Sequence, residues 1–91
     1  MKLVLAIVQD KDAGPAVEEL ISHGYRVTRI NTAGGFLKRG NATILIGVED
    51  GEVNDLVQIL RDICREPTVS PEGISATGVV FVLPVNAAYK F

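Results

Sequence analysis

Cysteine, histidine and tryptophan are nearly absent from this sequence of 91 residues, which holds one cysteine, one histidine and no tryptophan. A single cysteine, Cys64, cannot form a disulfide within the chain, and its place on an apolar helical face predicts a buried side chain. The lone histidine, His23, has no set of further ligands around it, so we expect neither a metal site nor a cofactor. Disulfide and metal chemistry are therefore set aside.

A strong excess of basic residues is also missing. Nine lysines and arginines stand against 11 acidic residues, which gives a formal net charge of −2 at pH 7. Proteins that bind nucleic acid usually carry a marked basic excess, because contacts with phosphates supply much of their affinity. The charge balance therefore argues against a nucleic-acid partner and leaves room for a small anionic ligand.

Hydrophobic runs long enough to span a membrane are missing, and so are groups of catalytic residues. The apolar residues 1–8 give way to Gln9, Asp10 and Asp12 too early for a signal peptide or a membrane span, so we expect no membrane span and a cytoplasmic location. No nucleophile stands with a base. The two aspartates at the strand-to-helix turn are explained by helix capping, with Asp12 as the N-cap. We therefore expect a protein that is not an enzyme.

Hydrophobic residues, by contrast, make up 47% of the sequence and follow two periods. Nearly continuous apolar runs at residues 2–9 and 42–48 predict central strands, while residues 25–30 alternate as an edge strand does. A loop is expected over 65–78 and a last strand over 79–83. Helical stripes are formed by Ala16, Val17, Leu20 and Ile21, which end at Gly24, and by Val53, Leu56, Val57, Leu60, Ile63 and Cys64, which follow a cap at Asp50.

The order of these elements, β-α-β-β-α-β, predicts an α+β fold of the ferredoxin-like kind. It consists of an antiparallel four-stranded sheet with both helices on one face. We expect a single domain over residues 1–91. The other face of the sheet would then expose Ile30 and other apolar residues, so assembly through that face is the hypothesis that follows.

The segment 32–41 joins two of the expected strands with more chemistry than a hairpin needs, since two residues would turn the chain. Gly34 and Gly35 leave backbone N–H groups uncovered for an anion. Phe36 offers a flat apolar surface on which a base can stack, and the amide of Asn41 can read a base edge or fix the loop. Turn chemistry alone for the glycines, and a plug at an interface for Phe36, remain alternatives.

With these residues in view, the sequence resembles the PII-like signalling proteins and, within them, the cyclic di-AMP receptor branch. The resemblance is carried by Ala-Ile-Val-Gln-Asp at 6–10 with Asp12, by the Gly-Gly-Phe-Leu motif at 34–37, and by Phe-Val-Leu-Pro-Val at 81–85. It implies a homotrimer with ligand sites in clefts between subunits. It also implies a receptor that reports the second messenger by changing the order of its loop and passes the signal to a downstream protein that the sequence does not identify.

Cyclic di-AMP carries two phosphodiester charges and two adenines, so its site needs cations, hydrogen-bond donors and flat apolar surfaces. By resemblance, Arg26 supplies a charge-assisted phosphate contact and Thr28 a hydrogen bond, while Phe81 lines the neighbouring side of the cleft. The ligand-binding residues that the resemblance implies are Arg26, Thr28, Gly34, Gly35, Phe36, Leu37, Asn41, Gly47 and Phe81.

Two features depart from the pattern of the receptor branch. Gly24 stands where that branch typically has an asparagine that helps to hold the ligand, and the segment 65–78 is much shorter than the loop found there. Two rival hypotheses therefore stay open. The chain binds another adenine nucleotide such as ATP or AMP, or it is a structural or interaction module without a small ligand. The copper-ligand residues of metal-tolerance proteins with a similar architecture have no counterpart in this sequence.

Overall fold

The computed structural model of the chain describes residues 1–30, 41–66, 69–70, 73–74 and 77–91. The helices and strands occur in the order β1 (Lys2–Gln9), α1 (Asp10–Ser22), β2 (Arg26–Ile30), β3 (Asn41–Val48), η1 (Asp50–Glu52), α2 (Val53–Ile63), β4 (Val69–Ser70), β5 (Gly73–Ile74) and β6 (Gly78–Pro84). Apart from the 3₁₀ turn η1 and the short pair β4 and β5, this is the predicted β-α-β-β-α-β order.

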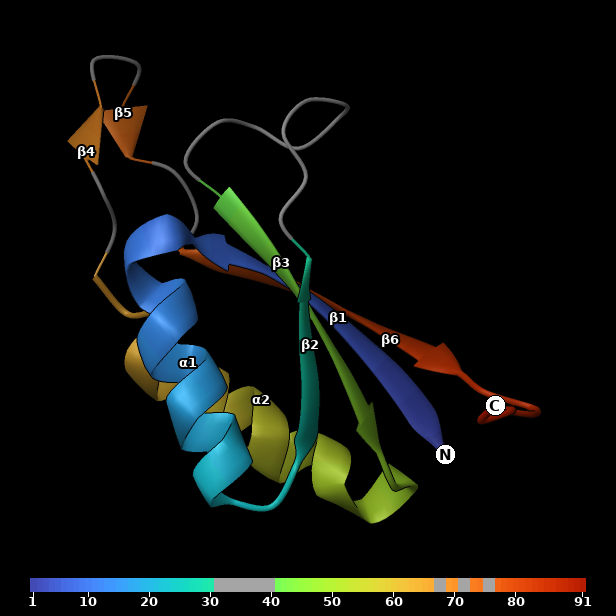
Figure 1. Cartoon of the computed structure of the whole chain (residues 1–91). Helices are drawn as coiled ribbons and strands as arrows, with labels where there is room; N and C mark the ends of the chain where they lie inside the picture. The colour runs from blue at the N-terminus through green and yellow to red at the C-terminus, as the bar shows by residue number, and fades with distance from the viewer. Residues whose placement is uncertain (31–40, 67–68, 71–72, 75–76) are drawn as a thin grey trace.

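The main sheet has the strand order β2-β3-β1-β6, and its neighbouring strands are all antiparallel. The two continuous apolar runs form the central strands β1 and β3, and the alternating run forms the edge strand β2, as predicted. Both helices lie on the same face of the sheet (Figure 1). The ferredoxin-like α+β fold is therefore confirmed.

The core lies between the helices and one face of the sheet. Side chains alternate along a strand, so every second residue of β1 and β3 faces the helices and is buried. Cys64, directly after α2, is 5% exposed, and its predicted burial is confirmed. Ile21 was expected in the stripe of α1 but is 56% exposed, because the buried face of this helix is narrower and is carried by smaller residues. The buried core consists of Val4, Ala6, Val8, Ala13, Ala16, Leu20, Ala42, Ile44, Ile46, Val48, Leu56, Leu60 and Cys64.

The start of α1 differs from the prediction, and its end agrees with it. The helix begins at Asp10 with Gln9 as N-cap, so the prediction of Asp12 as N-cap is wrong. The Asp12 carboxylate is buried and accepts a hydrogen bond of 3.0 Å from Gln9 Nε2, a group that also donates to the carbonyl of Glu66. At the other end, Gly24 follows the C-cap with φ of 87°, a conformation that glycine adopts without strain.

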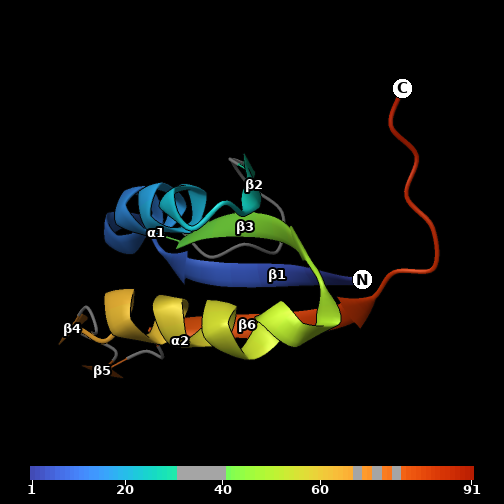
Figure 2. The same cartoon turned by 90° about the horizontal axis from the view of Figure 1, so that it is seen from below.

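The predicted cap at Asp50 is also wrong. The turn η1 precedes α2, and its capping box is made by Glu49 and Glu52, whose carboxylate Oε1 accepts a 3.0 Å hydrogen bond from the Glu49 N–H. Asp50 instead pairs with the amino group of Met1 at 3.0 Å. The predicted loop at 65–78 contains the antiparallel pair β4 and β5, so it is not loop throughout. After β6, residues 85–91 run away from the sheet (Figure 2).

Candidate functional site

The face of the sheet opposite the helices, called here the open face, is covered by neither helix. Its members follow from the alternation of each strand and from the register between strands. Arg26, Gly47, Leu3 and Leu83 form one row across the four strands, and the next row holds Thr28, Leu45, Leu5 and Phe81. A third row consists of Ile30, Thr43, Ile7 and Val79.

The open face is divided into two chemically different halves. The half on β2 and β3, called here the polar half, carries Arg26, Thr28, Asn41, Thr43 and Gly47, together with the apolar residues Ile30 and Leu45. The half on residues 3–7 of β1 and 79–83 of β6, called here the apolar half, carries Leu3, Leu5, Ile7, Val79, Phe81 and Leu83. The three residues from β6 are 45–52% exposed, so a large part of the apolar half is uncovered in a single chain.

Arg26 and Gly47 stand opposite each other at one end of the β2–β3 ladder. Together with Met1, Val48, Glu49 and Glu52 they line a cavity of about 270 Å³. A Cβ atom placed on Gly47 would meet nothing within 4 Å, so the space beside the arginine is open. The strands thus present a cation next to bare backbone, an arrangement that admits a ligand close to the chain.

The acidic residues in and beside this cavity make interactions of their own, with backbone N–H groups or with the N-terminus. Glu49 and Glu52 form the capping box of η1, and the N-terminal ammonium group, hydrogen-bonded to Asp50, holds the pKa of that carboxyl below its ordinary value. Within the part of the chain that the structure describes, the ion pairs are those of the N-terminus with Asp50 and of His23 with Glu19. Arg26 is exposed and has no ion-pair partner there. Its guanidinium group is free to bind an anion.

The structure brings some of the predicted ligand residues together and keeps others apart. Thr28 lies two residues along β2 from Arg26, a separation of about 7 Å between Cα atoms. Asn41 lies six residues from Gly47 at the far end of β3, or about 20 Å away. Phe81, 52% exposed, shares a row with Thr28 but lies three strands across the sheet, about 14 Å away. Gly34, Gly35, Phe36 and Leu37 lie outside the described residues.

A residue that the sequence analysis did not single out is Thr43. It is 5% exposed, and its hydroxyl is a buried polar atom without a hydrogen-bond partner in the described part of the chain. The signal was available in the sequence, since Thr43 is a hydroxyl residue inside an otherwise apolar run and shares its strand face with Gly47.

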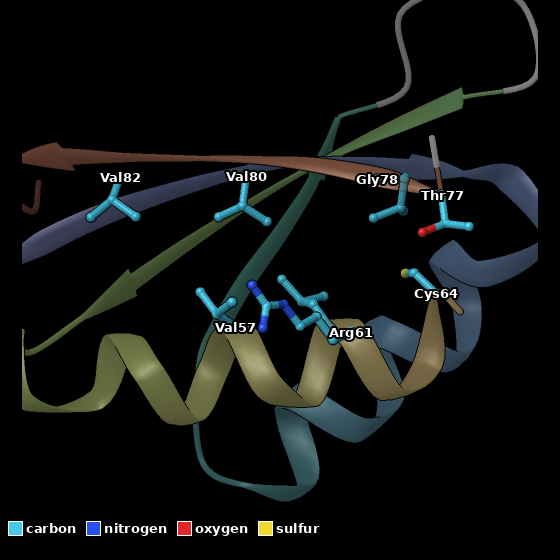
Figure 3. A pocket seen from close by; sticks show the side chains of 9 residues that line it. Val57, Arg61, Cys64, Thr77, Gly78, Val80 and Val82 are labelled. Carbon is cyan, nitrogen blue, oxygen red and sulfur yellow. The ribbon is translucent and has the colours of Figure 1, made fainter. Parts of the chain in front are cut away.

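A second cavity, of about 360 Å³, lies between α2 and β6 on the helix side of the sheet (Figure 3). It contains none of the predicted ligand residues. In Figure 3 the side chain of Arg61 extends from α2 into the space between Val57 and Val80, and the other polar groups shown are the Thr77 hydroxyl and the Cys64 thiol. Such a lining offers few donors for a ligand with two phosphates, so the polar half of the open face is the better candidate site. The cavity is lined by Val8, Val57, Leu60, Arg61, Cys64, Thr77, Gly78, Val80 and Val82.

No group of three or more histidine, cysteine, aspartate or glutamate side chains among the described residues is arranged to hold a metal ion. No helix in this part of the chain is long and apolar enough to cross a membrane.

These features define a small ferredoxin-like protein with a sheet face that neither helix covers, mostly polar on one half and apolar on the other. The sequence profile of the family described as "Cyclic-di-AMP receptor" matches residues 1–84. The chain therefore belongs to this PII-like receptor family. The fold is also similar to the crystal structure of a functionally unknown protein from Pediococcus pentosaceus, with 36% sequence identity and a TM-score of 0.79. That match covers 99% of this chain and 96% of the other.

Proposed function

We propose that the chain is a cytoplasmic receptor for cyclic di-AMP that works as a homotrimer, holds the ligand in clefts between subunits, and signals through rearrangement of the 32–41 loop to a downstream protein. Membership of a cyclic-di-AMP receptor family supports the ligand. The structural observation that carries the proposal is Arg26, a cation without an ion-pair partner among the described residues, beside the bare backbone of Gly47 in an open cavity.

The chemistry of this pair suits a phosphodiester. A guanidinium group donates two parallel hydrogen bonds to phosphate oxygens, and such charge-assisted bonds are about twice as strong as neutral ones. Thr28, one step along the same strand face, adds a hydroxyl donor. In our proposal the backbone N–H groups of Gly34 and Gly35 contribute further donors, while Phe36 and Leu37 flank an adenine.

The separation of the predicted residues supports a site between subunits. Arg26 on β2 and Phe81 on β6 lie near opposite edges of the sheet in one chain, and three strand spacings, about 14 Å, separate these two strands. The apolar half gives a physical reason for assembly, since burying exposed apolar side chains is favourable by about 25 cal/mol for each Å² removed from water. In a closed ring, the β6 edge of one subunit then faces the β2 edge of the next. We propose that Phe81 reaches the ligand from the next subunit in this way, while Asn41 contacts it from the end of β3.

Two rival functions are tested alongside this one. Gly24 closes α1 with backbone alone, so the side chain expected at this position in the receptor branch is missing, and another adenine nucleotide such as ATP or AMP remains a candidate ligand. The exposed apolar half also suits a structural module that binds no small ligand. A receptor should change the exchange of its 32–41 loop when its nucleotide is added, whereas a structural module should not.

Hydrogen exchange with and without cyclic di-AMP tests the receptor proposal directly. We expect slower exchange of the backbone amides of residues 34–41 when the ligand is present, and unchanged exchange in α1, which lies on the other side of the sheet and serves as the internal control. Equal exchange at 34–41 in both samples would contradict the proposal and favour a structural module. Analysis of the recovered nucleotide shows whether it is turned over, which a receptor does not do.

Sedimentation velocity tests the assembly. We expect the mass of three chains, with or without ligand. A chain that sediments as a monomer at every concentration would contradict a site shared between subunits.

A further inference from the structure

The hydroxyl of Thr43 is a buried polar atom that lacks a partner in the described part of the chain. Buried polar groups are almost always hydrogen-bonded, because removing them from water without a replacement bond is unfavourable. Where such a group remains unpaired in a folded protein, a missing ion, water or ligand is a usual explanation. The residue is 5% exposed, so bulk water does not readily supply the bond.

Thr43 lies on the polar half of the open face, four residues or about 13 Å from Gly47 along β3. The residue lies on the open face, two residues from Asn41 along β3. Its direct neighbours across the sheet are Ile30 of β2 and Ile7 of β1, whose side chains offer no hydrogen-bonding group. Thr28, opposite Leu45, is its diagonal neighbour, and such pairs lie about 7–8 Å apart. The hydroxyl groups of Thr28 and Thr43 therefore lie near each other on the polar half of the open face.

We infer that Thr43 is a further ligand-binding residue, whose hydroxyl forms a hydrogen bond with cyclic di-AMP that the free chain does not provide. The inference rests on the proposed function and adds a residue to that site. Because the hydroxyl is covered in the free chain, the bond forms together with a local rearrangement of the residues around it. Binding then relieves an unfavourable interaction of the free state, so Thr43 favours the liganded state over the free one.

We expect Thr43→Val to raise the stability of the free protein and to lower its affinity for cyclic di-AMP. Thr43→Val keeps the shape of the side chain and removes the hydroxyl, so the free protein loses an unsatisfied polar group and becomes more stable. We expect its melting temperature without ligand to rise by about 4–8 °C, the range for a domain of this size. At the same time its affinity for cyclic di-AMP falls about two- to tenfold, because the bond in the complex is lost.

The matched control is Thr43→Ser, which keeps the hydroxyl and removes the methyl group. Calorimetric titration of the unmodified protein and both variants with cyclic di-AMP, together with thermal melts of the free proteins, forms the experiment. We expect Thr43→Ser to bind within about twofold of the unmodified protein.

Three outcomes overturn the inference while leaving the proposed function intact. Full affinity of Thr43→Val means that the hydroxyl does not contact the ligand. Equal loss in both variants means that the methyl group, and not the hydroxyl, matters. Loss of the assembled mass of Thr43→Val in sedimentation means that the hydroxyl belongs to a contact between subunits. Absence of binding by the unmodified protein overturns the proposed function and this inference together, and it is recognised without any variant.

Discussion

Removal of the Arg26 side chain is the substitution that separates ligand binding from folding most cleanly. The guanidinium group is exposed and forms no ion pair with another described residue, so Arg26→Ala removes no folding interaction that the structure shows. We therefore expect the variant to melt within about 2 °C of the unmodified protein, as for most exposed substitutions.

Ligand binding by Arg26→Ala should respond strongly. Hydrogen bonds to charged groups contribute about 1.5–3 kcal/mol, and each 1.4 kcal/mol is a factor of ten, so the loss of affinity for cyclic di-AMP should be about ten- to 150-fold. Arg26→Lys should lie in between, because lysine keeps the charge and loses the two-pronged geometry. The difference in affinity for cyclic di-AMP between the unmodified protein and Arg26→Ala should also become smaller as the salt concentration rises, since salt screens exposed charges.

Arg29 provides the matched control on the same strand. It is also exposed, but it pairs with Ile44 and so lies on the helix side of the sheet, away from the cavity beside Gly47. Calorimetric titration of Arg26→Ala and Arg29→Ala should therefore show a loss for the first variant alone. Equal losses would mean that only net charge matters, and unchanged binding by Arg26→Ala would remove this residue from the site.

Three further predictions address the open space, the apolar half and the core. Gly47→Val should fold normally, because a Cβ at this position meets nothing within 4 Å. It should weaken cyclic di-AMP binding at least about tenfold, because the added side chain fills the space beside the phosphate site. Equal affinity in the same titration would refute this. Phe81→Ser should lower the assembled mass in sedimentation, whereas Ile21→Ser, at similar exposure but outside the open face, should not; a normal mass for both would leave the apolar half without a role in assembly. Burial raises the pKa of the Cys64 thiol to about 11, so the folded state favours the neutral thiol. The free energy of unfolding should therefore fall as the pH rises from about 9 to 11, because the thiol of the unfolded chain ionises first. Melts of Cys64→Ala over this range should show a smaller decrease, and an equal decrease would assign the effect to other groups.

The parts of the fold that sequence reasoning predicted well depend on period and on local backbone chemistry. The two long apolar runs are the central strands β1 and β3, in which the residues facing the helices are buried and the apolar residues on the open face are half-buried between flanking strands. Gly24 ends α1 because its conformation, with φ of 87°, is one that glycine tolerates best. Both signals are contained in a few neighbouring residues.

The parts that were predicted wrongly depend on contacts between distant residues. Asp12 lies inside α1, which begins at Asp10. Its carboxylate accepts a hydrogen bond from the amide of Gln9, which also donates to the carbonyl of Glu66. Asp50 pairs with the N-terminus, which β1 and β3 bring beside it, and leaves the capping to Glu49 and Glu52. The bond between Gln9 and Glu66 and the pairing of Met1 with Asp50 join residues far apart in the sequence, so no local pattern shows them.

The candidate site was predictable in part for the same reason. Alternation along residues 25–30 placed Arg26 and Thr28 on one face, and the structure confirms that they share it. Alternation did not show that Phe81 lies on the opposite edge of the sheet, since that depends on the strand order. It also did not show that the Thr43 hydroxyl is buried without a partner, which depends on what packs around it.

The central claim, that this chain is a receptor for cyclic di-AMP, is tested most directly by isothermal titration calorimetry of the unmodified protein. Cyclic di-AMP is titrated first, and ATP, AMP and cyclic di-GMP then serve as competitors at the same salt concentration. We expect saturable binding near one ligand per chain, with none of the competitors displacing cyclic di-AMP at equal concentration. Absence of binding, or tighter binding of another nucleotide, would contradict it.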